Sequence, residues 1–417
     1  MHPASKILTS ENPIEDVWKY LRLFLHHPFV EERIRNVHNL QKTDSRNNVR
    51  KQATQLGYCI RQAEEYFKAS SQVGLATRPV LLYYGAVSLT QALILLKQSG
   101  EYSFDALRKT DKHSHHGLDR IGFEDAGKAT DDIEQFFSVL RCRCHTKDKE
   151  GQEPWGQFPI FYQSLEASHF IVEADVHEGG KTSYLNANLS ERCSDMIPLA
   201  TLSATDLNVL DILKTLPDLY YLLHELGVRP ELRRGDLKRT IQQFVKPAPP
   251  DTTEGAPVKP EQPPKMVRVK TVDTSDMFIN DLDEDQKNHF LDFYRQRIPK
   301  LIVVAEFPNN LHLNLIHEIG ATNDALDVYY PDIVEDLSGA KFYIVRPESY
   351  LHEPAAFFVI LYCLGHLARY YPDIWMKAID TNSQIRELTN SLLNIAYRKF
   401  PNLILDQLTN TKHHIHI

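Results

Sequence analysis

The stretch that decides the fold covers residues 78–95 and reads RPVLLYYGAVSLTQALIL. Its proline, Pro79, suits the first turn of a helix, because the N–H that proline lacks would have no helical partner there. Apolar side chains then surround the whole helix. A helix without a polar face belongs at the centre of a domain, so this stretch predicts a buried helix around which the chain packs.

Further helical patterns lie on both sides of this stretch. Residues 12–29 open with a capping asparagine and a first-turn proline, followed by apolar side chains at helical spacing. Residues 205–226 are expected to form one helix that stops at Gly227, with a kink or break at Pro217. Similar patterns predict helices at 46–70, 133–140, 283–297, 351–370 and 383–400.

Strand patterns are fewer. Residues 168–189 alternate apolar and polar positions around a Glu-Gly-Gly-Lys turn, which is typical of a β-hairpin. Shorter strands are predicted at 266–272, 301–305 and 341–346. We therefore expect a mainly α protein of the α+β class. Its N-terminal domain would be helical and contain the hairpin, and its smaller C-terminal region would be rich in helices with a few strands.

A proline-rich stretch at residues 246–266 reads KPAPPDTTEGAPVKPEQPPKM. It has almost no aliphatic side chain to bury and favours extended conformations, as a linker or a disordered loop does. The alternative is a docking segment for an SH3- or WW-like partner. We predict a mainly helical domain at 1–245, this linker, and an α+β region at 267–417.

Composition narrows the class of protein. The formal charge of −8, from 55 acidic and 47 basic residues, argues against coating nucleic acid by charge alone, and no strong DNA-binding signature is present. The apolar run at 355–365 is much shorter than the roughly 20 residues that cross a bilayer. The N-terminus lacks a secretory pattern, and five scattered cysteines suit reduced thiols. We expect a cytoplasmic protein without a membrane partner.

Three segments stand out: the central helix at 78–95, the HGL of residues 116–118, and HLARYYPDIW at 366–375. Together they resemble the YaaC-like family of bacterial proteins. A fourth stretch at 210–222 fits the same pattern, so the resemblance brackets about residues 15 to 400. It implies a fold, but it supplies no reaction that can be carried over to particular residues.

The histidine-rich run RKTDKHSHHGLDR, residues 108–120, is the richest candidate for catalysis. Imidazoles beside guanidinium groups can move protons and stabilise a phosphate, which is the chemistry of metal-independent RNA cleavage. Arg108 and His113 have the Arg-x4-His spacing that is similar to the motif of HEPN ribonucleases. The same spacing recurs at 22–27 and 33–38, and a solvated, structurally fixed loop is the alternative. The candidate catalytic residues are Arg108, His113 and His116.

Two other clusters carry polar chemistry. Cys142, Cys144 and His145 form a Cys-x-Cys-His run, but standard zinc sites separate paired cysteines by two to four residues. We therefore expect no cofactor, and interpret the run as a basic segment that ends the helix at 133–140. His366 and Arg369 lie three residues apart on one helix face, where they can bind an anion or form a structural ion pair with a carboxylate such as Asp373.

The sequence leaves open whether the chain is an enzyme. The favoured reading is a helical binding or assembly module in a bacterial stress or phage-defence setting, with a protein partner or self-association. The alternative is a HEPN-like, metal-independent ribonuclease or phosphodiesterase, for which RNA is the partner. No local nucleophile signature such as Gly-x-Ser-x-Gly is present to indicate another reaction.

Overall fold

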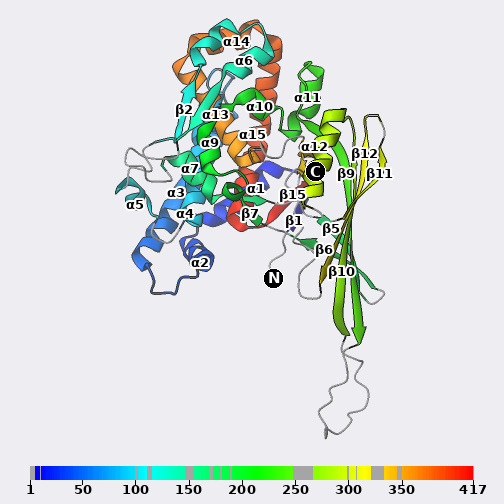
Figure 1. The fold of residues 1–417 in the computed structure, drawn as a ribbon. Helices are drawn as coiled ribbons and strands as arrows, with labels where there is room; N and C mark the ends of the chain where they lie inside the picture. The colour runs from blue at the N-terminus through cyan, green and yellow to red at the C-terminus, as the bar shows by residue number, and fades with distance from the viewer. Residues whose placement is uncertain are drawn as a thin grey trace.

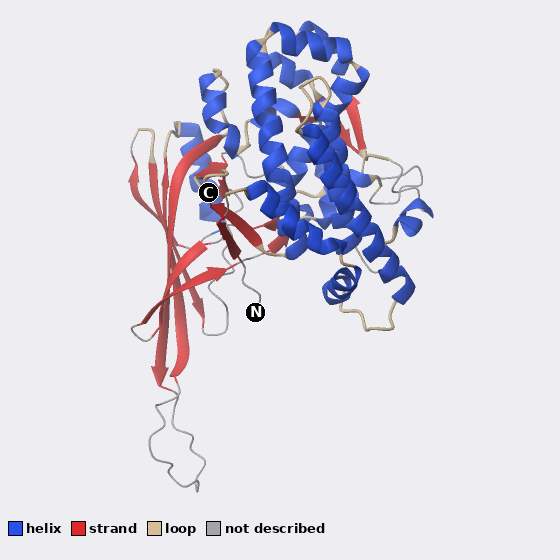
Figure 2. Cartoon of the chain, turned by 180° about the vertical axis from the view of Figure 1, so that it is seen from behind, coloured by secondary structure: helices blue, strands red, loops and turns tan. Residues whose placement is uncertain are grey.

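The computed structural model describes residues 5–9, 11–98, 102–109, 115–145, 155–168, 172–178, 181–187, 190–247, 266–297, 300–306, 308–320, 333–344 and 350–416. The helices gather in one body, and a large sheet lies along one side of it (Figures 1 and 2). The fold is mainly helical and of the α+β class, as the sequence predicts.

Helix α4, Arg78–Lys97, is the predicted central helix. It packs against α3, Arg46–Ser70, against α13, Glu353–Tyr370, and against α15, Ser383–Thr409. Within the described residues, α4 is long and apolar enough, by length and composition only, to cross a membrane. In this structure 72% of its apolar window is buried among other elements, which is the position expected of a core helix.

Two predicted helices are divided in the structure. The chain at 12–29 forms α1, Pro13–Leu21, then the 3₁₀ helix η1, Arg22–Leu25, and turns at the extended His26 before α2, His27–Val37. The chain at 205–226 divides because Pro217 has no N–H to continue a helix. It forms the strand β8, Leu207–Asn208, then α10, Val209–Leu213, η3, Pro217–Leu219, and α11, Tyr220–Glu225. Gly227, with φ +77°, follows α11 as predicted.

The remaining helices are shorter or lie nearer the surface. Those expected at 133–140 and 283–297 are present as α6 and α12. The bounds are α5 Phe104–Lys109, η2 Phe123–Lys128, α6 Ile133–Val139, α7 Gln157–Ser164, α8 Cys193–Met196, α9 Leu199–Ala204, α12 Glu284–Arg297 and α14 Pro372–Thr381.

The large sheet contains the predicted hairpin and the predicted short strands. Its described strands run in the order β11–β12–β10–β9–β14–β13, with β5 pairing in parallel with β9 and β6 pairing with β5. The bounds are β5 Val172–Glu178, β6 Lys181–Ala187, β9 Leu232–Pro247, β10 Met266–Ile279, β11 Lys300–Glu306, β12 Leu311–Gly320, β13 Ile333–Glu335 and β14 Lys341–Ile344. Strands β9 and β10 form the long antiparallel pair that extends beyond the helices in Figure 1.

The proline-rich stretch connects these two strands. Its first residues, Lys246 and Pro247, end β9, its last residue, Met266, begins β10, and Pro247 pairs with Met266. Residues 248–265 lie outside the described part. The division of the chain into two domains at 246–266 stays a prediction. Helices from both sides of it share one core, in which the rings of Phe158 and Phe358 stack with centroids 5.7 Å apart.

Smaller sheets complete the described fold. β2, Leu118–Ile121, pairs with β3, Arg141–Cys144, which pairs with β8. The segment after α6 is thus a strand and not the end of that helix, since its alternation buries Cys142 and Cys144 on one face. β4, Glu166–Ser168, pairs with β7, Ser190–Arg192, and β1, Ser5–Thr9, pairs in parallel with β15, Lys412–His416. The last pair brings the two ends of the chain together.

Candidate functional site

Helices α4 and α13 approach closely at Gly365. A Cβ atom at this position would lie 3.0 Å from Cβ of Tyr83 and 3.4 Å from the carbonyl oxygen of Pro79. Only glycine fits this contact without a shift of the neighbouring atoms. The close approach brings the side chains next to Gly365 on α13 against the face of α4 that carries Tyr83.

The segment that carries His116 is held between α7 and α13. Gly117 has φ +75°, and a Cβ there would lie 2.4 Å from Cδ of Pro159. The backbone N–H of Phe158 donates to the carbonyl of His116 at 2.9 Å. The hydroxyl of Tyr362 on α13 donates to the carbonyl of Leu118 at 2.7 Å. These contacts fix the backbone of the HGL segment next to α13.

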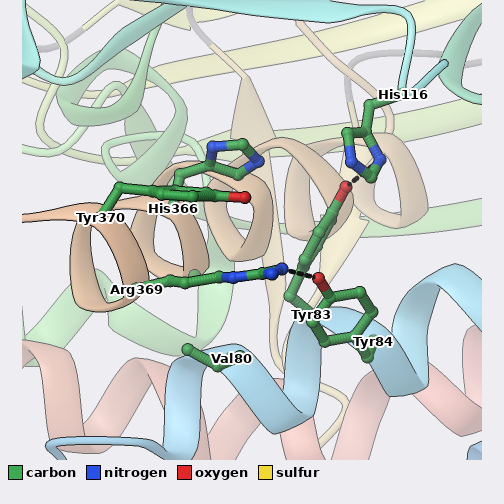
Figure 3. A pocket seen from close by; sticks show the side chains of 8 residues that line it. Val80, Tyr83, Tyr84, His116, His366, Arg369 and Tyr370 are labelled. Atoms are coloured by element: carbon green, nitrogen blue, oxygen red, sulfur yellow. Dashed lines mark hydrogen bonds between the residues drawn. The ribbon is translucent and has the colours of Figure 1, made fainter.

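A small hollow lies where α4, α13 and this segment meet (Figure 3). Its cavity volume is about 10 Å³, which is close to the space that one water molecule needs. A ligand would therefore bind at the mouth of the hollow and insert at most a small group into it. Its lining is formed by Val80, Tyr83, Tyr84, His116, Gly365, His366, Arg369 and Tyr370.

His116 is oriented by Tyr83. The hydroxyl of Tyr83 lies 2.8 Å from Nδ1 of His116, and burial raises the pKa of this tyrosine well above its usual value. Tyr83 therefore keeps its proton, and when its hydroxyl donates to Nδ1 the proton of the neutral imidazole lies on Nε2. Burial, with His115 and Arg369 nearby, lowers the pKa of His116. His116 is thus a neutral N–H donor near pH 7.

His366 is the second imidazole of the hollow. Its ring centroid lies 5.8 Å from that of His116, with the two rings perpendicular. Its Nδ1 is buried and has no hydrogen-bond partner among the described residues. Burial, followed by the influence of His116, Arg120 and Arg369, lowers the pKa of His366 to about 4. Buried polar atoms in native proteins nearly always have a hydrogen-bond partner, so this unsatisfied nitrogen requires an explanation.

Arg369 lies at the exposed mouth of the hollow. Its guanidinium donates to the hydroxyl of Tyr84 and lies 5.0 Å from the ring centroid of Tyr370. Arg120, on β2, lies 5.7 Å from the same ring. Within the described parts of the chain, neither arginine forms an ion pair with a carboxylate, so the expected partnership of Arg369 with Asp373 is not formed. The mouth therefore carries two guanidinium groups without an ion pair among the described residues, and the charge of Arg120 helps to lower the pKa of the nearby Glu124.

Comparison with known proteins confirms the family resemblance of the sequence. A family model described as YaaC-like Protein matches residues 19–408. The chain belongs to the YaaC-like family. No curated protein and no solved structure matches it. The match to the YaaC-like family covers α4, the HGL segment and α13, and therefore every residue that lines the hollow.

The structure brings together some of the predicted site residues of this YaaC-like chain. His116, predicted for catalysis, lies beside His366 and Arg369, predicted for anion binding. Arg108 lies on the short helix α5, 3.9 Å from Asp105, and does not line the hollow. His113 lies outside the described residues. The catalytic roles of Arg108, His113 and His116 stay predictions.

The Cys-x-Cys-His run is divided between one buried face of β3 and the residue that follows the strand. Cys142 and Cys144 are buried, and burial raises the pKa of Cys144 to about 12. His145 instead pairs with the exposed carboxylate of Asp119. Among the residues that the structure describes, no group of three or more His, Cys, Asp or Glu side chains is placed to hold a metal ion.

The sequence did not single out Tyr83 and Tyr84. Both lie inside the apolar central helix, where aromatic side chains read as core. Their two hydroxyls could have marked them as site residues, because a buried tyrosine hydroxyl usually requires a hydrogen-bond partner. Those partners are His116 for Tyr83 and Arg369 for Tyr84.

Proposed function

We propose that this YaaC-like protein is a helical binding module whose hollow recognises an anionic group presented by a partner. The observation that carries the proposal is the guanidinium of Arg369, which lies at the hollow without a carboxylate partner among the described residues. Hydrogen bonds from a guanidinium to an anion are stronger than those between neutral groups. With the proton of His116 on Nε2, an anion at this position would also accept a hydrogen bond from that N–H group.

The proposed binding partner and biological setting of the protein rest on the sequence. We propose a protein partner or a second copy of the chain, in the cytoplasm. The setting of bacterial stress or phage defence rests on the comparison with HEPN-like helical proteins. A genomic neighbourhood that encodes restriction or toxin-like proteins would support this setting, and neighbours confined to housekeeping metabolism would count against it.

Anion binding is tested by thermal unfolding in sulfate and in chloride at matched ionic strength. A ligand that binds only the folded state raises the melting temperature in a concentration-dependent way. We expect sulfate to stabilise the wild type and the Arg50→Gln variant, which removes an arginine with 63% side-chain exposure on α3. Arg369→Gln should lose this response. Equal responses in all three proteins would contradict a site at Arg369.

A second candidate function is cleavage of RNA without a metal. The observation that favours it is the pair of imidazoles with centroids 5.8 Å apart beside Arg369. In such a step neutral His366 takes the proton of a ribose 2′-hydroxyl, and the 2′-oxygen attacks phosphorus. The bond to the 5′-oxygen breaks, and this leaving oxygen takes a proton from protonated His116.

Binding is the better supported function because the low pKa values oppose this chemistry. Both imidazoles are shifted toward the neutral form, and with a pKa of about 4 His366 is a weak base. Because His116 must be protonated to act as the acid, the rate of cleavage would rise as the pH falls. Incubation of RNA with wild-type protein in EDTA tests the idea, with His116→Ala, His366→Ala, Arg108→Ala and His113→Ala alongside. Intact RNA with every protein between pH 5.5 and 7.5 would eliminate cleavage.

A further inference from the structure

We infer that the anion in the hollow is a phosphate dianion held between Arg369 and Arg120, and that its binding brings a proton onto His366. This inference rests on the proposed function and deepens it in two respects. It names the class of ligand, and it adds a proton to the binding equilibrium.

Two guanidinium groups from distant parts of the chain share one tyrosine ring. Arg369 on α13 and Arg120 on β2 lie 5.0 and 5.7 Å from the centroid of Tyr370. Both are exposed, so a ligand can reach them from solvent. Guanidinium groups present planar sets of donors that match phosphate oxygens. Two such groups favour a dianion over a carboxylate, which carries one charge.

The carboxylates nearest to Arg120 along the chain are already engaged. Asp119 pairs with His145. Glu124 accepts a hydrogen bond from the hydroxyl of Tyr371 at 2.6 Å. Arg120 also interacts with Tyr371, and its charge helps to lower the pKa of Glu124. A phosphate would therefore share Arg120 with these two side chains, whereas Arg369 has no such carboxylate neighbour among the described residues.

His366 faces neutral and cationic groups on every side that the structure describes. From α4 it meets Tyr83, from the HGL segment His116, and from β2 the charge of Arg120. Its neighbours on its own helix are Tyr362, Arg369 and Tyr370. None of these groups carries a negative charge at neutral pH. The described residues thus offer no negative charge to stabilise an imidazolium at this position.

A bound dianion would place a negative charge near His366 and so favour its protonated form. An opposite charge within about 4–6 Å typically raises the pKa of a histidine by roughly 1–3 units. The free protein holds the pKa of His366 at about 4. Binding would then bring it to about 5–7 and give the buried ring a charged partner. Proton uptake and phosphate binding would favour each other, since linkage is reciprocal.

Isothermal titration calorimetry at pH 5.5 tests the inference. Sulfate is the probe for proton counting, because phosphate esters themselves titrate with a pKa near 6. Titrations in two buffers with different ionisation enthalpies give the number of protons taken up. A pKa raised from about 4 to about 5–7 predicts uptake of roughly 0.2 to 0.9 proton with the wild type at pH 5.5. The same shift makes sulfate binding roughly 1.3- to 25-fold tighter at pH 5.5 than at pH 7.5.

Variants test whether His366 takes up the proton and whether Arg120 contributes to anion binding. His366→Gln should bind sulfate without the tighter binding at low pH and with clearly reduced uptake. His26→Gln, at an exposed histidine outside the hollow, should keep both. Arg120→Gln should weaken sulfate binding about tenfold or more, as expected for the loss of a charge-assisted contact.

The ligand class is tested at pH 7.5 with inorganic phosphate, AMP, phosphoserine and acetate. Phosphate or either ester binding at least tenfold tighter than acetate supports the dianion, and the tightest of the three indicates its source. Acetate binding as tightly as phosphate overturns the inference, and so does sulfate binding without proton uptake. Both of these results leave anion binding intact. If no anion binds the wild type, the proposed function fails together with the inference.

Discussion

The hydroxyl of Tyr83 lies 2.8 Å from Nδ1 of His116, and this contact joins the central helix to the HGL segment. It is a hydrogen bond between a nearly fully buried tyrosine, 2% exposed, and a ring at the mouth of a hollow. This contact couples the proton of the Tyr83 hydroxyl to the tautomer of His116. When the hydroxyl donates to Nδ1, an anion in the hollow would meet the Nε2–H group of His116.

Tyr83→Phe should weaken sulfate binding about three- to tenfold. The substitution keeps the ring in the core but frees His116 to change its tautomer and orientation. The lost hydrogen bond should also lower the free energy of unfolding by about 1 kcal/mol. Calorimetry with sulfate and chemical unfolding measure the two effects. Tyr58→Phe, at a side chain that is 59% exposed, should change neither. Unchanged affinity in Tyr83→Phe would show that the tautomer of His116 does not matter for binding.

Gly365→Ala should lower the free energy of unfolding by about 1–3 kcal/mol, although alanine is the better helix former. The added methyl group would lie 3.0 Å from Cβ of Tyr83 and force α13 away from α4. Gly57→Ala is the matched control, because Gly57 also lies inside a helix and its nearest atom would be 3.5 Å away. Urea unfolding should show Gly57→Ala at or above wild-type stability. A stable Gly365→Ala protein would mean that the contact is not tight.

The elements that could be predicted from the sequence are those fixed by neighbouring residues. Helix α4 and helix α3 carry their own apolar spacing, and their bounds agree with the predicted stretches. The pairing of β9 with β10 depends on residues on both sides of the proline-rich stretch. Composition indicates that such a stretch cannot form a core, but it does not indicate that its two ends lie side by side in one sheet.

The site was predictable in separate pieces. His116 and the pair His366 and Arg369 each stand out as polar residues in segments that resemble the family. Their meeting depends on the packing of α13 against α4, a contact between distant parts of the chain. Tyr83 was not predictable as a site residue, because its apolar surroundings in sequence conceal the role of its hydroxyl.

Lys399→Met should destabilise the fold by about 3–5 kcal/mol. The buried ammonium of Lys399 lies 2.6 Å from the carboxylate of Asp218 and 2.6 Å from that of Glu353. Removing it leaves two enclosed carboxylates without a counter-charge. These carboxylates raise the pKa of Lys399, so the ammonium is charged throughout the physiological range. Chemical unfolding measures the loss, and Lys19→Met, at an exposed ion pair with Asp16, should cost less than about 1 kcal/mol. A loss that small at Lys399 would contradict the assignment of a buried charged cluster.

His352→Gln should reduce the loss of stability in acid. His352 precedes α13, its Nδ1 is enclosed without a partner among the described residues, and burial lowers its pKa from 6.5 to about 4. The unfolded chain therefore binds a proton at this residue below pH 6.5, whereas the folded protein binds it only near pH 4. The contribution of neutral His352 to the free energy of unfolding is fully present above pH 6.5. It falls by up to about 3 kcal/mol as the pH drops toward 4. Urea unfolding at pH 7.5, 6.0 and 5.0 should show a steeper decline for the wild type and for His26→Gln than for His352→Gln. Parallel declines in all three proteins would mean that His352 is not the residue whose protonation opposes folding.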